Sequence, residues 1–195
     1  MARTAALALS CLMLLAAAAA ERASAAPVVT ETITYYDVNG ATAAEVRASL
    51  NQRGPIDSTE KRRFDAVTHW YVNWHFNYQD RGRDCAIAHV STTVRVAITM
   101  PQLSAASAAP PALRQAFAKY VQNLLGHEKG HVRIGINIAQ RIEDAIRALR
   151  PEPSCDRLER AANARGHALI KEANRQDINY DAATQHGKTQ GARFP

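Results

Sequence analysis

The sequence predicts an α+β domain in which an antiparallel sheet packs on one long helix and a second helix follows towards the C-terminus. Two neighbouring segments, residues 68–78 and 86–100, alternate apolar and polar side chains with the two-residue period of β-strands. In residues 111–149 the apolar positions recur instead at spacings of three and four, which is the period of an α-helix. The same helical period returns in residues 155–174.

Residues 1–25 read as a secretory signal and not as part of the fold. Arg3 supplies the positive charge, Leu7 to Ala20 form an apolar run too short to span a bilayer comfortably, and Ala23-Ser24-Ala25 offers a cleavage site. We therefore expect one domain, residues 26–195, in a protein that is secreted or periplasmic after cleavage and has no stable membrane anchor.

The overall charge gives little indication of a partner. The 195-residue chain carries a formal net charge of +6, and its basic residues are scattered rather than gathered in a stripe with interleaved aromatic residues. Because nucleic-acid-binding proteins usually show such a stripe or a recognisable motif, we expect no nucleic-acid partner.

The first elements of the domain carry their own boundary signals. Residues 28–38 are rich in strand formers and end at Asn39-Gly40, a turn signal. Thr42 then opens a short helix with Glu45 three residues later, which is the pattern of a capping box. The two alternating segments that follow, 68–78 and 86–100, are predicted to form an antiparallel hairpin.

The long helix contains the sequence His-Glu-x-x-His at residues 127–131. Pro111 suits its first position and Pro151 ends it, and both His127 and His131 fall on its buried stripe. Residues four apart share a helix face, so the two imidazoles can reach one metal ion. A hydrogen-bonded pair of core histidines is the alternative, but two such groups are costly to bury unless something binds them.

Zinc is the metal that this motif favours. A catalytic zinc ion takes three protein ligands and leaves one position open, so His127 and His131 require one more ligand from elsewhere in the chain. Glu128, between them, has the position of the general base that takes a proton from water in this arrangement.

Two cysteines remain after the predicted signal is removed. In an exported protein the pair Cys85 and Cys155 is best explained as one disulfide, which would bracket the metal-binding helix. The alternative, a role as metal ligands or nucleophiles, is disfavoured because neither cysteine has a CxxC partner or an adjacent base.

Several motifs together resemble a known family. They are the segment Trp70–Tyr78, Cys85 and Cys155, the motif at 127–131, and the ending Tyr180-Asp181-x-x-Thr184-x-His186-Gly187-x-x-Gln190-Gly191. This set resembles the bacterial family of predicted secreted zinc-dependent proteases, long carried as a domain of unknown function, over essentially the whole mature chain. The resemblance implies a peptidase and supplies no substrate. Ile134 and Asn137 stand where a metzincin needs Gly and His, so the chain does not resemble that group.

The third zinc ligand is left open among four residues. Glu143 lies about 18 Å further along the helix from His131 and cannot reach the metal. Glu159 or Glu172 could serve from the second helix, and Asp181 or His186 from the C-terminal segment.

We favour His186 among these four, because the tail signature otherwise has no reason to fold back on the domain; a disordered tail is the alternative. Asp181 would then accept a hydrogen bond from a ligand histidine, or be the ligand itself. Tyr180 is expected to donate a hydrogen bond to the developing oxyanion.

These expectations combine into an exported metallopeptidase with one Zn²⁺ per chain and Glu128 as general base, acting on a peptide or protein. Two other functions stay open from the sequence. One is a cell-envelope interaction module that binds zinc without catalysis, and the other is a zinc amidase that acts on cell-wall peptides.

Overall fold

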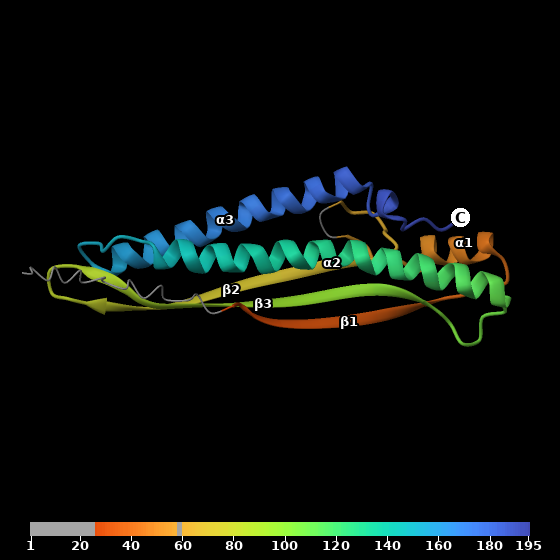
Figure 1. Ribbon diagram of the computed structural model, residues 1–195, viewed down its shortest axis with the longest axis horizontal. Coiled ribbons are helices and arrows are strands. Elements are labelled where there is room, and N and C mark those ends of the chain that lie inside the picture. The colour runs from red at the N-terminus through yellow and green to blue at the C-terminus, as the bar shows by residue number, and fades with distance from the viewer. Residues whose placement is uncertain (1–25, 58–59) are drawn as a thin grey trace, which may run out of the picture.

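The computed structural model describes residues 26–57 and 60–195 and shows an elongated α+β molecule, which confirms the predicted fold class (Figure 1). The predicted signal, residues 1–25, lies outside the described residues. The elements in chain order are β1 (Val28–Val38), α1 (Ala43–Arg53), β2 (Val67–Asp80), β3 (Cys85–Leu103), α2 (Pro111–Arg147), α3 (Cys155–Thr184) and a 3-10 turn, η1 (Lys188–Gln190).

The sheet has the strand order β1-β3-β2 and is mixed rather than wholly antiparallel. β2 and β3 form the predicted antiparallel hairpin, whereas β1 pairs in parallel with β3. The prediction of an antiparallel sheet was wrong for β1, because a two-residue hydrophobic period shows which side chains face the core and not in which direction the strand runs. After β1 the chain passes through α1 and β2, so it enters β3 in the direction of β1.

α2 and α3 cover one face of the sheet, as Figure 1 shows. Two glycines allow the helices to pack closely on β2: a Cβ added to Gly135 would lie 2.9 Å from Trp70, and one added to Gly166 would lie 2.6 Å from Trp74. The apolar side chains of β3 and α2 fill the space between the layers. No helix within residues 26–57 and 60–195 is long and apolar enough to cross a membrane.

α3 continues ten residues beyond the predicted end at residue 174 and stops at Thr184. In this last part its side chains Asp177, Tyr180 and Asp181 contact histidines of α2 instead of an apolar core. A hydrophobic pattern cannot reveal such a polar helix face. The extension matters because it carries both carboxylates alongside the His-Glu-x-x-His segment.

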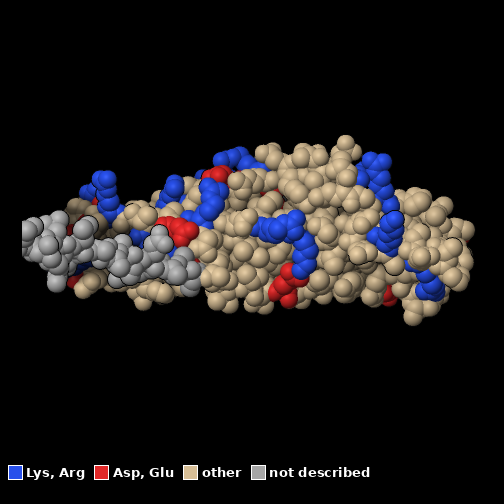
Figure 2. Space-filling model, in the orientation of Figure 1, with Lys and Arg blue, Asp and Glu red and all other residues tan. Residues whose placement is uncertain are grey.

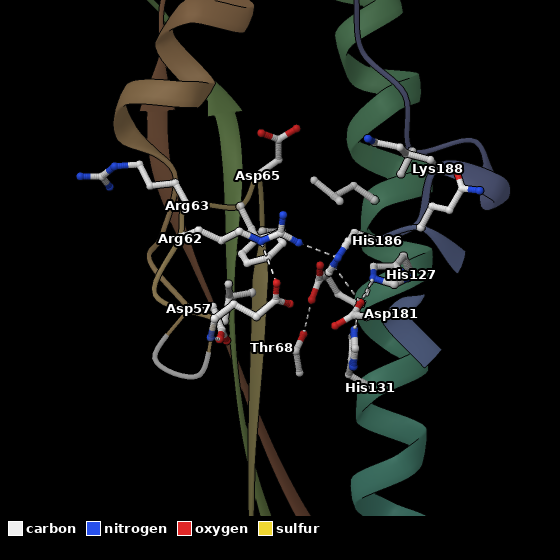
Figure 3. Close-up of a pocket in the computed structure, with 18 of the residues that line it drawn as sticks. Asp57, Arg62, Arg63, Asp65, Thr68, His127, His131, Asp181, His186 and Lys188 are labelled. Atoms are coloured by element: carbon white, nitrogen blue, oxygen red, sulfur yellow. Dashed lines mark hydrogen bonds and ion pairs between the residues drawn. The ribbon is translucent and has the colours of Figure 1, made fainter. Parts of the chain in front are cut away.

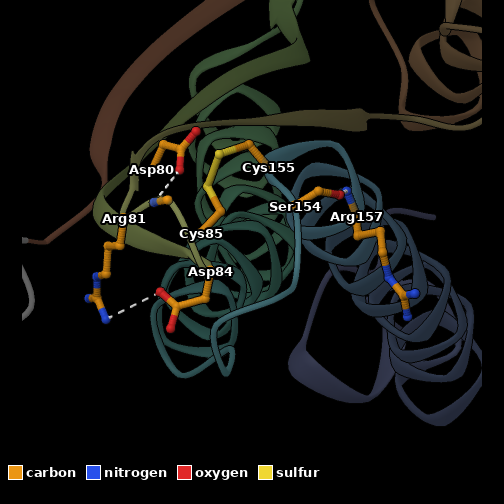
Figure 4. Close-up of a disulfide and its surroundings, with 8 residues drawn as sticks. Asp80, Arg81, Asp84, Cys85, Ser154, Cys155 and Arg157 are labelled. Carbon is orange, nitrogen blue, oxygen red and sulfur yellow. Dashed lines mark hydrogen bonds and ion pairs between the residues drawn. A yellow bond between two sulfur atoms is a disulfide. The ribbon is translucent and has the colours of Figure 1, made fainter.

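The predicted disulfide between Cys85 and Cys155 is present (Figure 4), with a Cα–Cα distance of 5.0 Å. It joins the first residue of β3 to the first residue of α3. The backbone of Cys85 also exchanges two hydrogen bonds with Glu152. Together these contacts fix the end of the molecule at which α2 passes into α3.

Candidate metal centre

Three potential metal ligands converge where α3 runs beside α2 (Figure 3). The Nε2 atoms of His127 and His131 are 3.3 Å apart. Asp181 Oδ1 lies 3.0 Å from His127 Nε2 and 3.2 Å from His131 Nε2. Both histidines are buried, with 3 % and 6 % of their surface exposed. The protein thus presents two imidazole nitrogens and one carboxylate oxygen to a single point.

The far nitrogens of the two rings fix how these ligand atoms are presented. His127 Nδ1 lies 3.0 Å from Gln190 Oε1, and His131 Nδ1 lies 2.8 Å from Asp177 Oδ1. Since an amide oxygen and a carboxylate can only accept, each Nδ1–H donates outward. In the neutral form that a metal ligand requires, the Nε2 lone pairs of both rings then point at Asp181. Three hydrogen-bond acceptors that converge in this way fit a bound cation.

The electrostatics of the cluster also favour a positive charge at this point. Burial by itself would lower the pKa of His131, but the hydrogen bonds to Asp177 and Asp181 outweigh burial and raise this pKa to about 10. Burial of Asp181 acts to raise its pKa, yet the hydrogen bonds to His127 and His131 hold it well below its ordinary value. Without a metal, a proton on His131 supplies the positive charge that the carboxylates require.

Glu128 faces the same cavity without belonging to the group of converging ligand atoms. It is 3 % exposed, and its Oε2 accepts a hydrogen bond of 2.7 Å from the hydroxyl of Thr68 on β2. Burial raises the pKa of Glu128, although the Thr68 hydrogen bond opposes that shift. The environment therefore makes this carboxylate more basic than an exposed one.

The cavity in front of the cluster has a volume of about 970 Å³. The start of β2 and the segment before it form one wall, and α2, α3 and the C-terminal tail form the other. Arg62 enters from the first wall: its guanidinium stacks 4.5 Å from the ring centre of Phe64 and lies 2.9 Å from His186 Nε2. Figure 3 shows Arg62 and His186 meeting across the cavity.

His186, the residue favoured as third ligand from the sequence, lies next to Asp181 and outside the cluster of three ligand atoms. Its Nδ1 lies 3.4 Å from Asp181 Oδ1, and it is not a member of the group formed by Asp181 and the two α2 histidines. A second group of potential ligands joins His186 with Asp181 and Glu60. Arg62 lies 2.7 Å from Glu60 and also contacts His186. Its cationic side chain therefore takes the position that a metal ion would have in this second group.

Tyr180 lies where it can support His127 rather than an oxyanion. Its ring stacks on the His127 imidazole with centroids 5.0 Å apart, and its hydroxyl donates to the backbone oxygen of His127 at 3.2 Å. A Cβ on Gly130 would lie 2.1 Å from that hydroxyl, so α3 approaches α2 closely only because residue 130 is glycine. Tyr180 is not among the residues that line the cavity, which leaves the predicted oxyanion contact without geometric support.

The remaining glutamates considered as ligands lie elsewhere. Glu172 pairs with Arg141 at 2.9 Å, and neither Glu159 nor Glu172 joins a group of potential ligands among the described residues. Glu143 is buried beside Thr92 and Arg147, in agreement with its exclusion on distance.

The C-terminal tail reaches the site through a tight reversal of the chain after α3. Gln185, His186 and Gly187 all have left-handed backbone conformations, with φ values of 52°, 52° and 79°. A Cβ on Gly187 would lie 2.9 Å from the His127 ring, so this position needs glycine for its close approach as well as for its φ. The reversal brings Gln190 to Nδ1 of His127.

Sequence reasoning missed Asp177, Thr68 and Arg62 as parts of the site. The spacing of Asp177, four residues before Asp181, would place both on one helix face and could have identified it, had the helix been extended that far. Thr68 and Arg62 carry no local signal, since they reach the site only through the tertiary fold.

A family model described as "Bacterial protein of unknown function (DUF922)" matches residues 33–187, which is more than half of the chain. The matched region includes the three converging residues and Glu128, and it ends at Gly187, before Gln190. Neither the curated proteins nor the solved structures contain a match to the chain.

Proposed function

The chain belongs to this bacterial family of unknown function, and we propose that it is a zinc-dependent peptidase with His127, His131 and Asp181 as its metal ligands. The observation that carries the proposal is the convergence of three ligand atoms next to a buried glutamate that is not itself a ligand. Zinc suits this set because it binds imidazole nitrogen and carboxylate oxygen, and because catalytic zinc sites use three protein ligands.

Asp181 is the third ligand in this proposal, in place of His186. Its Oδ1 lies within 3.2 Å of both histidine Nε2 atoms, whereas among His127, His131 and Asp181 the contact of His186 is with Asp181. His186 then supports the ligand carboxylate: its Nδ1 lies 3.4 Å from Asp181 Oδ1, and its Nε2 accepts a hydrogen bond from Arg62.

Zinc held at such a site lowers the pKa of a coordinated water to about 7 and withdraws electron density from a substrate carbonyl. Glu128 supplies the proton transfer. The Thr68 hydroxyl donates a hydrogen bond to Oε2 of Glu128, whereas Oε1 of Glu128 has no hydrogen-bond partner among the described residues. With a pKa raised by burial, Glu128 can accept a proton from the attacking water and then donate it to the leaving amine nitrogen.

We also propose that the protein works outside the cytoplasm. The predicted signal at residues 1–25 and the Cys85–Cys155 disulfide support this placement, because disulfides persist in oxidising compartments. A polypeptide in that compartment is the proposed substrate, and the cavity provides the space beside Glu128 for its backbone.

The test compares wild type with Glu128→Gln on unfolded casein and on cell-wall peptides. We expect the variant to keep one zinc per chain and to lose at least about a hundredfold in casein hydrolysis, because a general base is removed and no ligand is changed. Glu172→Gln is the matched control and should change neither quantity. Hydrolysis of cell-wall peptides alone would indicate an amidase. Zinc binding without hydrolysis of either substrate would indicate a non-catalytic module. Each of these two results would overturn the peptidase proposal.

A further inference from the structure

β1 forms an edge of the sheet that nothing in the described part of the chain covers. Among residues 26–57 and 60–195 it pairs only with β3, so within this part of the chain its other side has no strand partner along Val28–Val38. Val28, Val29 and Tyr35 are 66 %, 40 % and 54 % exposed. Proteins usually protect an edge of this length with lysine, proline or a bulge, and β1 contains none of these.

The two charged residues of β1 are already engaged within the chain. Glu31 forms an ion pair with Lys129 of α2, and Asp37 accepts a hydrogen bond of 2.8 Å from Gln102. In Figure 2 the lower margin of the molecule, along which β1 runs in Figure 1, shows few charged side chains. The edge therefore offers little electrostatic resistance to another strand.

An apolar groove lies beside the same edge. It has a volume of about 470 Å³ and runs between the end of β3, with Tyr35 of β1 beside it, and the first half of α2. Its walls include Tyr35, Leu103, Phe117, Val121 and Leu125. Figure 1 shows α2 running along the sheet at the level of β2 and β3, with β1 beyond them. The first part of β1 thus has less helical cover than β2 and β3 have, whereas Val38 at its end is buried beside α1.

We propose that β1 pairs in an antiparallel manner with β1 of a second copy of the chain, which gives one continuous sheet of six strands. A two-fold axis perpendicular to the sheet, passing between the two Ile33 residues, produces this pairing and keeps the helices of both copies on one face. Val29, Glu31 and Ile33 then face the helices in both copies, as their pairing with Val94, Val96 and Ile98 requires.

The composition of β1 is complementary to itself in this register. Thr32 lies opposite Thr34 of the second copy, which places threonines side by side on the outer face. Glu31 meets the second copy's Tyr35, and Asp37 meets its Val29, so no carboxylate faces another. This self-complementarity is the reason for choosing a second copy rather than a strand of another protein.

Pairing would also cover the exposed side chains on the side of β1 that faces the helices. The two β3 strands would be separated by three strand spacings, about 14 Å, whereas packed helices lie about 8–10 Å apart. The side chains of Val29, Ile33 and Tyr35 from both copies would fill the gap between the two α2 helices. The metal centre is not obstructed, because its cavity opens beside β2, at the opposite edge of the sheet.

The test is sedimentation velocity on the mature protein over a wide concentration range, with two double variants that differ at one position. Thr32→Lys with Thr34→Lys places like charges opposite each other across the two-fold axis and should weaken dimerisation by about tenfold or more. Thr32→Lys with Thr34→Glu places opposite charges there and should remain dimeric. Both variants change the same two exposed positions, so they should affect the fold of a single chain similarly. Circular dichroism and zinc content should show that both variants are folded.

A monomeric wild type would overturn the proposal and leave the edge for a strand of a different protein. The same oligomeric state in both double variants would overturn it as well, because that state would then not depend on the pairing of Thr32 with Thr34. These outcomes are independent of peptidase activity.

Discussion

The His131 imidazole is held between two carboxylates, Asp177 at Nδ1 and Asp181 at Nε2. Two carboxylates on opposite sides of a buried ring favour a positive charge on or beside that ring. The ring can take up a proton, or a metal ion can replace that proton at Nε2. The same contacts that raise its pKa therefore make zinc binding compete with protonation. The competition gives the metal-free protein a characteristic pH dependence.

Metal-free protein should lose stability as the pH rises from about 6.5 to about 10. The folded-state pKa of His131, about 10, exceeds its ordinary value of 6.5, so the stabilisation is complete below 6.5 and disappears as the pH passes 10. Thermal melts of chelator-treated and zinc-loaded protein across this range measure the effect, and the zinc-loaded form should change less. Asp177→Asn should reduce the loss. Equal pH dependence of the two forms would show that no proton is held in place of the metal.

The packing of α3 on α2 determines the site at the scale of secondary-structure elements. Asp177, Tyr180 and Asp181 all lie on the last two turns of α3. Asp177 contacts His131, whereas Tyr180 and Asp181 contact both α2 histidines. Gly130, between the histidines, permits this approach because a side chain there would collide with Tyr180. The distance between the two helices is thus controlled by one residue.

Gly130→Ala and Gly126→Ala should have opposite effects, although they lie one turn apart on α2. The new methyl group at 130 would fall 2.1 Å from the Tyr180 hydroxyl, so we expect a lower melting temperature and weaker zinc binding. At 126 no atom of the described residues, apart from the helix backbone and the adjacent residues, lies within 4 Å of an added Cβ, and alanine should stabilise the helix by about 1 kcal/mol. Melting temperatures and zinc affinities of both variants test this; a harmless Gly130→Ala would contradict the close packing.

The sequence predicted these elements unevenly, for physical reasons. The period of three and four and the prolines at its ends predicted α2, and the motif within it predicted His127, Glu128 and His131 as neighbours. The role of Asp181 could not be derived in the same way, because it depends on α3 continuing past residue 174 with a polar face. The parallel direction of β1 leaves no trace in a two-residue period.

For the molecule as a whole, the C-terminal tail joins the proposed metal centre to the hydrophobic core. Gln190 contacts His127, while Phe194 packs on Phe117 and Tyr120, and its backbone oxygen accepts a hydrogen bond from Arg47. The tail thus makes two separable sets of contacts, one with His127 and one in the core. This separation can be measured.

Deleting residues 188–195 should both weaken zinc binding and lower the melting temperature. Gln190→Ala should reproduce only the first effect, by about 10- to 100-fold, because it removes the acceptor that orients a ligand histidine. Phe194→Ala should reproduce only the second, because it removes an aromatic side chain from the core. Zinc titration and thermal unfolding of the three proteins check this, and a deletion without effect on either quantity would rule out both roles.

The most direct test of the proposed zinc site is the zinc affinity of Asp181→Ala and His186→Ala relative to wild type, measured by competition with a chelator. If His127, His131 and Asp181 are the ligands, Asp181→Ala removes a metal bond and should lower the affinity by several orders of magnitude. His186→Ala removes a neighbour that lies 3.4 Å from that ligand, and no metal bond, so it should cost about 10- to 100-fold. A larger loss in His186→Ala, or unchanged affinity in Asp181→Ala, would contradict the proposed site.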